Sequence, residues 1–118
     1  HVDYIHEIIG NAISDDVAVV ISAGNNSNNT NNECPSDMYD PIVVSAINSY
    51  GNLCDFSNYG STIDVAAPGE DVYSAYPGGG YTSLNGTSMA APHISAVCAM
   101  YRLQNSKANI YYGKIRKT

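Results

Sequence analysis

Gly86-Thr87-Ser88-Met89-Ala90-Ala91-Pro92-His93 is the stretch of this 118-residue chain on which the fold prediction depends. It places a serine where a loop turns into a helix, and an apolar run of mostly small residues, Ile94 to Met100, follows it. Pro92 indicates the first turn of the helix, since a missing N–H costs nothing there. A serine at a helix N-terminus lies beside unpaired N–H groups and the positive end of the helix dipole, which suits an oxyanion that develops during acyl transfer. A Thr or Ser N-cap on an ordinary buried helix produces the same local pattern.

Three further segments lie upstream of this stretch. The run Val19-Val20-Ile21-Ser22-Ala23-Gly24-Asn25 is an apolar strand that ends on an asparagine. Between it and the serine lie Phe56-Ser57-Asn58-Tyr59-Gly60 and Asp64-Val65-Ala66-Ala67-Pro68-Gly69. In residue type and in order, these segments resemble the subtilisin-like serine proteases, the subtilases of peptidase family S8. The resemblance is strongest over residues 17–103.

This resemblance implies an α/β protein with the subtilisin-like fold, a parallel sheet flanked by helices. Ser88 resembles the nucleophile of the family, whose own backbone N–H is one oxyanion donor. Asn25 resembles the second donor, a side-chain amide aimed at the same oxygen. Ser22, Ala23 and Gly24 resemble one wall of the pocket for the substrate side chain before the cut bond. The implied activity is that of a serine endopeptidase, which hydrolyses peptide bonds through an acyl-enzyme on Ser88.

The other two triad residues of the family are not recognisable in this chain. Subtilases carry the triad in the order Asp, His, Ser, but neither an Asp-Thr-Gly or Asp-Ser-Gly segment nor a His-Gly-Thr-His segment is present. His1 and His6 are interpreted as solvated helix residues, and His93 as a packing residue and not the general base. We therefore expect the triad Asp and His upstream of residue 1. Residues 1–118 are then the C-terminal fragment of a single catalytic domain, with only the C-terminal portion of the fold and no activity alone.

Two alternatives stay open. In the first, the chain belongs to a subtilisin-like pseudoenzyme, which kept Ser88 but lost the upstream histidine or aspartate and acts as a binding or regulatory protein. In the second, the chain is an unrelated α/β module, such as an esterase, whose similarity to the subtilases is limited to the stretch around Ser88. Asn25 and the segment 64–69 argue against this second alternative.

The composition fits a globular interior and argues against two kinds of partner. Hydrophobic residues make up 44% of the chain and charged residues 14%. The net charge of −6 argues against a nucleic-acid partner. No apolar stretch approaches the roughly 18 residues that span a membrane. The expected partners are a polypeptide substrate and the missing N-terminal part of the catalytic domain, and the resemblance alone implies an extracellular or cell-surface location.

The hydrophobic pattern alternates between helix and strand, which is typical of an open α/β sheet. Apolar residues recur at helical spacing over residues 2–14, and the serine helix is expected over 87–103. Residues 25–32, mostly asparagine, predict a surface loop. The predicted strands are 17–22, 42–47, 63–66, 72–75 and 81–84, the last two as a hairpin. The basic tail, Arg102 to Thr118, is interpreted as a solvated helix end.

The resemblance requires no cofactor, and calcium is possible in the full-length protein. Asp64 lies where some family members hold a weakly bound cation, but calcium takes about six to eight oxygens, and an exposed strand-edge aspartate is the simpler interpretation. Cys98 is interpreted as a small core residue. A disulfide between Cys34 and Cys54 stays open for an oxidising compartment. The cysteines lack Cys-x-x-Cys spacing, so the sequence predicts no metal site, zinc included.

Overall fold

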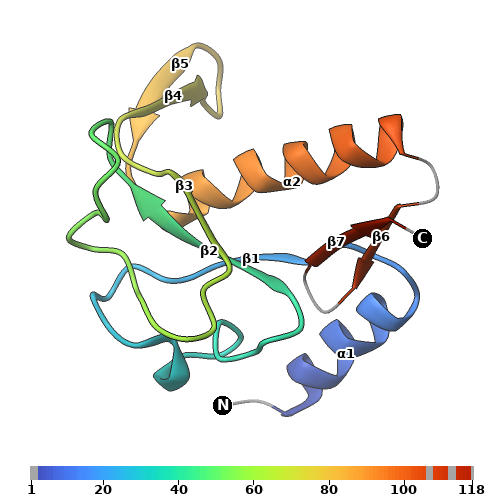
Figure 1. The fold of residues 1–118 in the computed structure, drawn as a ribbon. Helices are drawn as coiled ribbons and strands as arrows, with labels where there is room; N and C mark the ends of the chain where they lie inside the picture. The colour runs from blue at the N-terminus through green and yellow to red at the C-terminus, as the bar shows by residue number, and fades with distance from the viewer. Residues whose placement is uncertain (1–2, 106–107, 112–113, 118) are drawn as a thin grey trace.

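A parallel sheet of three strands lies at the centre of the chain (Figure 1). The computed structural model describes residues 3–105, 108–111 and 114–117, with side chains for residues 3–105. The strands are adjacent in the order of the sequence, β1 (Val20–Ser22), β2 (Ile42–Ile47) and β3 (Val65–Pro68). Val20 pairs with Ile42, and Val44 pairs with Val65, both in parallel register. The predicted α/β class with a parallel sheet is confirmed.

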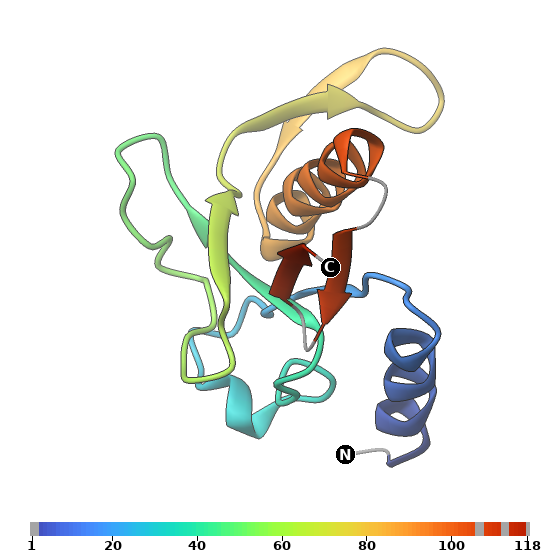
Figure 2. The same cartoon turned by 45° about the vertical axis from the view of Figure 1, so that its right-hand side comes forward.

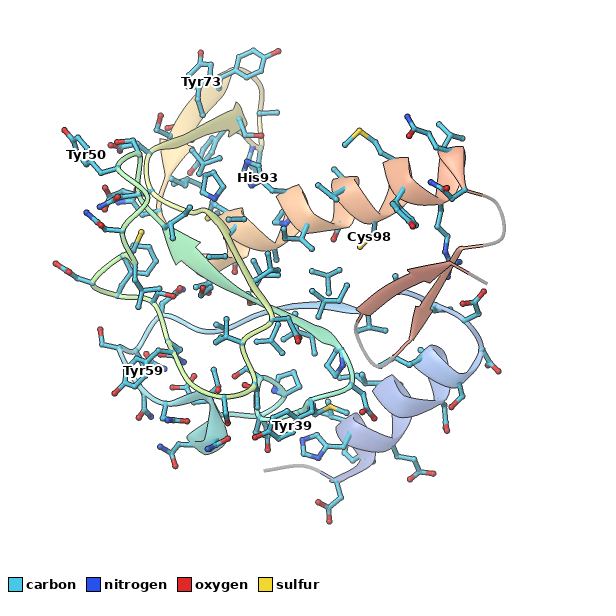
Figure 3. The ribbon with its side chains drawn as sticks, in the orientation of Figure 1. Tyr39, Tyr50, Tyr59, Tyr73, His93 and Cys98 are labelled. Atoms are coloured by element: carbon cyan, nitrogen blue, oxygen red, sulfur yellow. The ribbon has the colours of Figure 1, made fainter. Side chains whose placement is uncertain are left out.

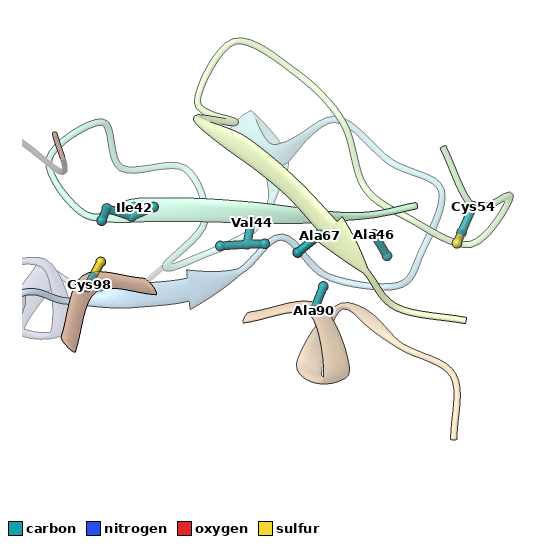
Figure 4. Packing of buried hydrophobic residues seen from close by; sticks show 7 residues of the cluster. All are labelled: Ile42, Val44, Ala46, Cys54, Ala67, Ala90 and Cys98. Atoms are coloured by element: carbon teal, nitrogen blue, oxygen red, sulfur yellow. The ribbon is translucent and has the colours of Figure 1, made fainter. Parts of the chain in front are cut away.

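Helix α2 (Thr87–Gln104) covers the sheet and contacts all three strands (Figures 1 and 2). Strand β2 is buried along almost its whole length, as the middle strand of a parallel sheet must be. The hydrophobic core joins the sheet to α2 and to the loop after β2, and its buried members are Ile42, Val44, Ala46, Cys54, Ala67, Ala90 and Cys98 (Figure 4). Because Ala90 is small and fully buried, α2 can approach the sheet closely. Burial of Ile42 and Val44 stabilises the fold by roughly 1.5–3 kcal/mol each.

Helix α1 (Asp3–Ser14) precedes β1 and has no fully buried residue. The Arg102 Nη2 atom donates to Asp16 Oδ1 at 2.8 Å and to the Asp16 carbonyl at 3.1 Å, which links the turn after α1 to the end of α2. Both side chains are well exposed, so this ion pair contributes at most about 1 kcal/mol. Within the described residues, no helix combines the length and the apolar character needed to cross a membrane.

A separate hairpin follows the sheet, as the sequence predicts. Strands β4 (Val72–Ala75) and β5 (Tyr81–Leu84) are antiparallel, with Val72 opposite Leu84. The rings of Tyr73 and Tyr81 stack, with their centroids 5.5 Å apart. Figure 2 shows that the hairpin reaches over α2, so it forms a wall beside this helix.

Two predicted strands begin later than expected. Strand β1 begins at Val20 because the chain before it still closes α1, where the Val17 N–H donates to the Ala12 carbonyl at 3.0 Å. Strand β3 begins at Val65, where its parallel pairing with Val44 starts; just before it, the Asp64 carboxylate accepts from the Val43 N–H at 3.1 Å and the Asp64 N–H donates to the Val43 carbonyl at 3.0 Å. In both places hydrogen bonds that the apolar pattern does not reveal lie just before the strand.

The interpretation of the basic tail as a helix end is wrong. Helix α2 ends at Gln104, and Asn105, its C-cap, has an extended φ of −132°. Strands β6 (Ala108–Tyr111) and β7 (Lys114–Lys117) then pair in antiparallel register. The β-branched and aromatic residues of this segment favour strands and outweigh its basic pattern. The rest of the tail, 106–107, 112–113 and 118, lies outside the described residues.

A buried asparagine anchors the polar loop after β1, which is a surface loop as predicted and contains the short 3-10 helix η1 (Thr30–Asn32). Asn58 Oδ1 accepts from the N–H groups of Asn26 and Asn28 at 3.0 and 2.9 Å. Its Nδ2 donates to the carbonyl of the residue after β1 at 3.0 Å and to the Glu33 carboxylate at 2.7 Å. Asn58 is fully buried, so these hydrogen bonds are shielded from water and hold the loop in one conformation.

Asn58→Ala is expected to destabilise the protein by about 2–4 kcal/mol, because several backbone groups and a carboxylate lose their partner at once. Unfolding in denaturant measures this loss. Asn52→Ala, on an exposed asparagine of a turn, is the matched control and is expected to change stability by less than about 0.5 kcal/mol. A loss for Asn58→Ala no larger than that of the control would contradict the anchoring role.

Candidate active site

The serine stretch begins helix α2, as the sequence predicts. Gly86 is the N-cap, and its φ of 153° is a conformation that favours glycine. Pro92 lies inside the helix that begins at Thr87, so its prediction in the first turn is wrong. The helix begins at Thr87, as predicted, and its first turn precedes Pro92, since the Met89 N–H already donates to the Gly86 carbonyl at 3.1 Å. Since proline has no N–H, the Ser88 carbonyl receives no helical hydrogen bond from position 92.

Thr87 holds the Asn25 side chain at the start of α2. Asn25 Oδ1 accepts from the Thr87 N–H and from the Thr87 hydroxyl, both at 2.8 Å. The same hydroxyl accepts from the Gly24 N–H at 3.1 Å. Thr87 is fully buried, so these hydrogen bonds are not weakened by water. They fix the carbonyl oxygen of the Asn25 amide on Thr87. The Nδ2 atom of the same amide therefore points away from Thr87.

Two N–H donors converge beside Gly86. A Cβ atom on Gly86 would lie 3.6 Å from Asn25 Nδ2 and 3.7 Å from the Ser88 backbone nitrogen. Neither nitrogen donates a hydrogen bond to any residue in the described part of the chain. Met89 Sδ lies 3.3 Å from the same point, so this sulfur and the two nitrogens surround the space beside Gly86 at the positive end of the α2 dipole. The structure thus brings the two predicted catalytic residues, Ser88 and Asn25, to one point.

Ser88 is exposed and lies at a groove of about 430 Å³ between α2 and the β4–β5 hairpin. Apolar residues on its walls include Val72, Ala75 and Leu84 from the hairpin and Met89, Pro92 and Ala96 from α2. A hydroxyl at the edge of a groove is accessible to an incoming carbonyl group, so Ser88 is open to reaction in this structure.

His93 lies on the side of α2 that faces the hairpin (Figure 3). It is exposed and lines the groove, so its prediction as a packing residue is wrong for the described chain. Its Nδ1 bonds the Met89 carbonyl at 2.9 Å, one helical turn before it. No hydrogen bond joins His93 to Ser88 among the described residues.

His6 is not the solvated helix residue that the sequence predicts. Its Nε2 lies 2.9 Å from Asp37 Oδ1 and 3.5 Å from Cys34 Sγ. The sequence could not indicate these contacts, because they join α1 to a loop 28–31 residues further along. His1 lies outside the described residues.

The predicted pocket wall, Ser22, Ala23 and Gly24, lies at the end of β1. The Ala23 side chain is only 1% exposed, so it packs inward. Gly24 has a φ of 108°, and a Cβ atom there would collide with the Asn58 amide, so only glycine fits. The Gly24 N–H contacts the Thr87 hydroxyl, which joins this segment to α2. The role of the three residues in substrate binding stays a prediction.

The three cysteines are free thiols, so the disulfide considered between Cys34 and Cys54 does not form in the structure. Cys98 is buried on the sheet side of α2, which confirms it as a core residue (Figure 3). Burial raises the pKa of the Cys98 thiol, and the nearby Arg102 opposes this with a smaller effect. Burial also raises the pKa of the Cys54 thiol, and two neighbouring carboxylates add to it. Both thiols are therefore neutral and weakly nucleophilic at neutral pH.

Asp64 is not the exposed strand-edge residue that the sequence analysis favours. It is half-buried, and its Oδ2 accepts from the Val43 N–H. Calcium takes about six to eight oxygen ligands, and the one carboxylate that the sequence singled out already holds a backbone N–H. Calcium in the full-length protein stays an implication of the family resemblance alone and enters no step of the reaction proposed below.

Thr87 and Asn58 position the candidate site, and the sequence analysis did not single them out. Thr87 directly precedes the candidate nucleophile in the sequence, and this position is a signal for a hydroxyl that positions the site. Asn58 offers no such signal, because the chain contains many asparagines and most of the neighbouring ones lie on the surface.

Known proteins are similar to this chain in sequence over most of its length. The family model of the subtilases (peptidase S8) matches residues 2–111. Thermitase of Thermoactinomyces vulgaris is 40% identical over 101 residues, which are 86% of this chain and 36% of thermitase. The subtilisin-like serine protease Pen ch 13.0101 of Penicillium rubens is 36% identical over 95 residues, which are 80% of this chain and 24% of that protein.

The fold agrees with the sequence comparison. The crystal structure of a cold adapted subtilisin-like serine proteinase matches with a TM-score of 0.87 and 33% identity, over 89% of this chain and 38% of that chain. The chain thus spans 24–36% of the two curated relatives and a similar share of the solved structure. Since the family model covers nearly the whole sequence and the sheet and helices superpose on a solved member, this chain belongs to the subtilase family.

Proposed function

We propose that this chain carries the nucleophile and the oxyanion hole of a serine endopeptidase, which hydrolyses peptide bonds through an acyl-enzyme on Ser88. The observation that carries the proposal is the convergence of Asn25 Nδ2 and the Ser88 N–H beside Gly86. The names of two relatives, a subtilisin-like serine protease and a subtilisin-like serine proteinase, support a polypeptide as the substrate. The family match removes the unrelated α/β module from consideration.

In the proposed reaction, the Ser88 hydroxyl oxygen attacks the carbonyl carbon of the scissile bond, and a histidine takes the hydroxyl proton. The carbonyl oxygen becomes an oxyanion, which the Asn25 amide and the Ser88 N–H stabilise. The histidine gives its proton to the leaving amine, the C–N bond breaks, and the acyl group stays on Ser88. A water molecule that loses a proton to the same histidine then releases the acid product and restores the serine.

We place the histidine and its aspartate in a part of the protein before residue 1. The solved relative is longer than this chain, which covers 38% of it. Helix α2 also carries large apolar side chains in contact with solvent, with Val97 47% exposed, Met100 58% and Leu103 87%. A row of exposed apolar residues on one helix supports the packing of a further segment against it.

The complete coding sequence and a cleavage assay test this proposal. The region upstream of His1 is expected to encode Asp-Thr-Gly or Asp-Ser-Gly and then His-Gly-Thr-His, and the full-length protein is expected to cleave an unfolded polypeptide. A sequence in which either residue is replaced, together with no cleavage, would instead favour the pseudoenzyme, a binding or regulatory protein.

Thr87→Val is expected to lower the turnover of the full-length enzyme by about 10–100-fold with little change in KM, because the amide of Asn25 loses its support. Thr87→Ser, which keeps the hydroxyl, is expected to restore most of the turnover. Steady-state kinetics on a peptide substrate measures both variants. A Thr87→Val enzyme with the turnover of the wild type would show that the hydroxyl does not support the site.

A further inference from the structure

The side chains of His6, Cys34 and Asp37 lie close together, outside the groove at Ser88, and each offers one atom that can bind a metal ion. Their donor atoms all lie within 4.8 Å of one another, and all three residues are half-buried. We propose that these residues form a zinc site. The ion joins helix α1 to the loop that follows η1.

The contacts of His6 converge on one ring nitrogen. In a relay of nucleophile, histidine and acid, the histidine uses one nitrogen for the nucleophile and the other for the acid. Here Cys34 Sγ and Asp37 Oδ1 both contact Nε2, at 3.5 and 2.9 Å. The cluster is therefore not arranged as a second nucleophilic site. Three donors around one point is the arrangement that a metal ion needs.

The donor set selects zinc among the common ions. Calcium and magnesium take oxygen ligands, whereas zinc takes imidazole nitrogen, thiolate sulfur and carboxylate oxygen together. Tetrahedral zinc with bonds of about 2.0–2.3 Å separates its ligand atoms by about 3.3–3.6 Å. The 3.5 Å between His6 Nε2 and Cys34 Sγ already lies in this range.

Binding requires the His6 and Asp37 side chains to move apart. The 2.9 Å between His6 Nε2 and Asp37 Oδ1 must widen by about half an ångström as their hydrogen bond is replaced by two bonds to zinc. The Cys34 thiol loses its proton to solvent when the zinc–sulfur bond forms. A water molecule takes the fourth position, because the cluster has three protein ligands.

Two of the ligands lie on a turn that is already formed. The Asp37 N–H donates to the Glu33 carbonyl at 2.9 Å, and the Ser36 hydroxyl donates to the same carbonyl at 3.0 Å. The third ligand comes from α1, which has no fully buried residue of its own. A zinc ion bound here therefore links helix α1, which is weakly packed, to the preformed turn that carries Cys34 and Asp37.

The charge of the chain also favours a cation here. All eleven acidic residues lie between Asp3 and Asp71, and no Lys or Arg precedes Arg102. The cluster lies inside this acidic part. Sequence spacing could not reveal it, because its ligands are 28 residues or more apart between α1 and the turn.

Zinc and cobalt binding to the purified full-length protein, freed of metal by a chelator, tests the proposal. The wild-type protein is expected to bind one zinc ion at this site and, with Co²⁺ in its place, to show a thiolate-to-cobalt charge-transfer band. Cys34→Ala is expected to abolish this band and to weaken zinc binding at least about 100-fold. Even residues that only hydrogen-bond to a metal ligand change metal affinity by about 10–100-fold when they are replaced. Zinc is also expected to raise the Tm of the wild-type protein but not that of Cys34→Ala.

Cys54→Ala is the matched control, because it removes a thiol outside the cluster and should leave zinc affinity and the cobalt spectrum unchanged. Asp37→Asn, which keeps the shape of the side chain, gives a second measurement where Cys34→Ala does not fold, and weaker zinc binding is expected. A wild-type protein that binds no zinc, or variants that bind it as tightly as wild type, would overturn the proposal. These measurements do not use peptide hydrolysis, so their outcome does not bear on Ser88.

Discussion

Ser88→Ala is expected to lower the turnover of the full-length enzyme by about 10⁶, the magnitude known for subtilisin, a member of the same family. Without the hydroxyl oxygen no acyl-enzyme forms, whereas the two N–H donors beside Gly86 remain in place. The substrate therefore still binds, and KM is expected to change little. Steady-state kinetics on a peptide with a chromogenic leaving group measures the loss.

Ser95→Ala is the matched control for this variant. Ser95 lies on the same helix, is exposed, and its hydroxyl donates to the Ala91 carbonyl at 3.5 Å. Its removal is expected to leave turnover unchanged. A Ser88→Ala enzyme as active as the Ser95→Ala enzyme would exclude Ser88 as the nucleophile.

Asn25→Ala is expected to lower turnover by about 10²–10³ while substrate affinity stays nearly the same, as for the oxyanion-hole asparagine of subtilisin. The reason is that the amide Nδ2 contacts the oxygen only once it has become an oxyanion, so its loss is felt in the transition state. The same kinetic assay, with kcat and KM determined separately, measures the effect.

Asn31→Ala is the control for Asn25→Ala, because Asn31 is an exposed asparagine of the same loop. Its turnover is expected to match that of the wild type. Thermal unfolding of both variants checks that the Asn25 effect is not a loss of fold, since Thr87 also loses a hydrogen-bond partner. Unchanged turnover in folded Asn25→Ala would remove this residue from the mechanism.

Much of the fold could be predicted because the buried strands and the serine helix have strong local patterns. The continuous apolar run Ile42–Ile47 corresponds to β2 residue by residue, and the hairpin strands match their predicted bounds. The starts of β1 and β3 could not be predicted from the apolar pattern, because the hydrogen bonds of Val17 and Asp64 just before them leave no mark in it. The tail forms strands β6 and β7 because its β-branched and aromatic residues outweigh its basic pattern.

The candidate site could be predicted only in its principal residues. Ser88 and Asn25 lie at positions that the family motifs mark, and the structure brings them together through Thr87. The supports behind them could not be predicted, because Asn58 binds the loop from more than 20 residues away along the chain. The same holds for His6, whose contacts depend on how α1 lies against a distant turn.

Labelling of the full-length protein with a fluorophosphonate, followed by mass analysis of its peptides, tests the central claim most directly. The phosphonate reacts only with a serine that a base activates, and the adduct resembles the tetrahedral intermediate that the oxyanion hole binds. We expect a single modification on Ser88, its absence in Ser88→Ala, and slower labelling in Asn25→Ala. A folded protein that stays unlabelled, or that carries the label on another serine, would contradict the assignment of Ser88 as the nucleophile of a serine endopeptidase.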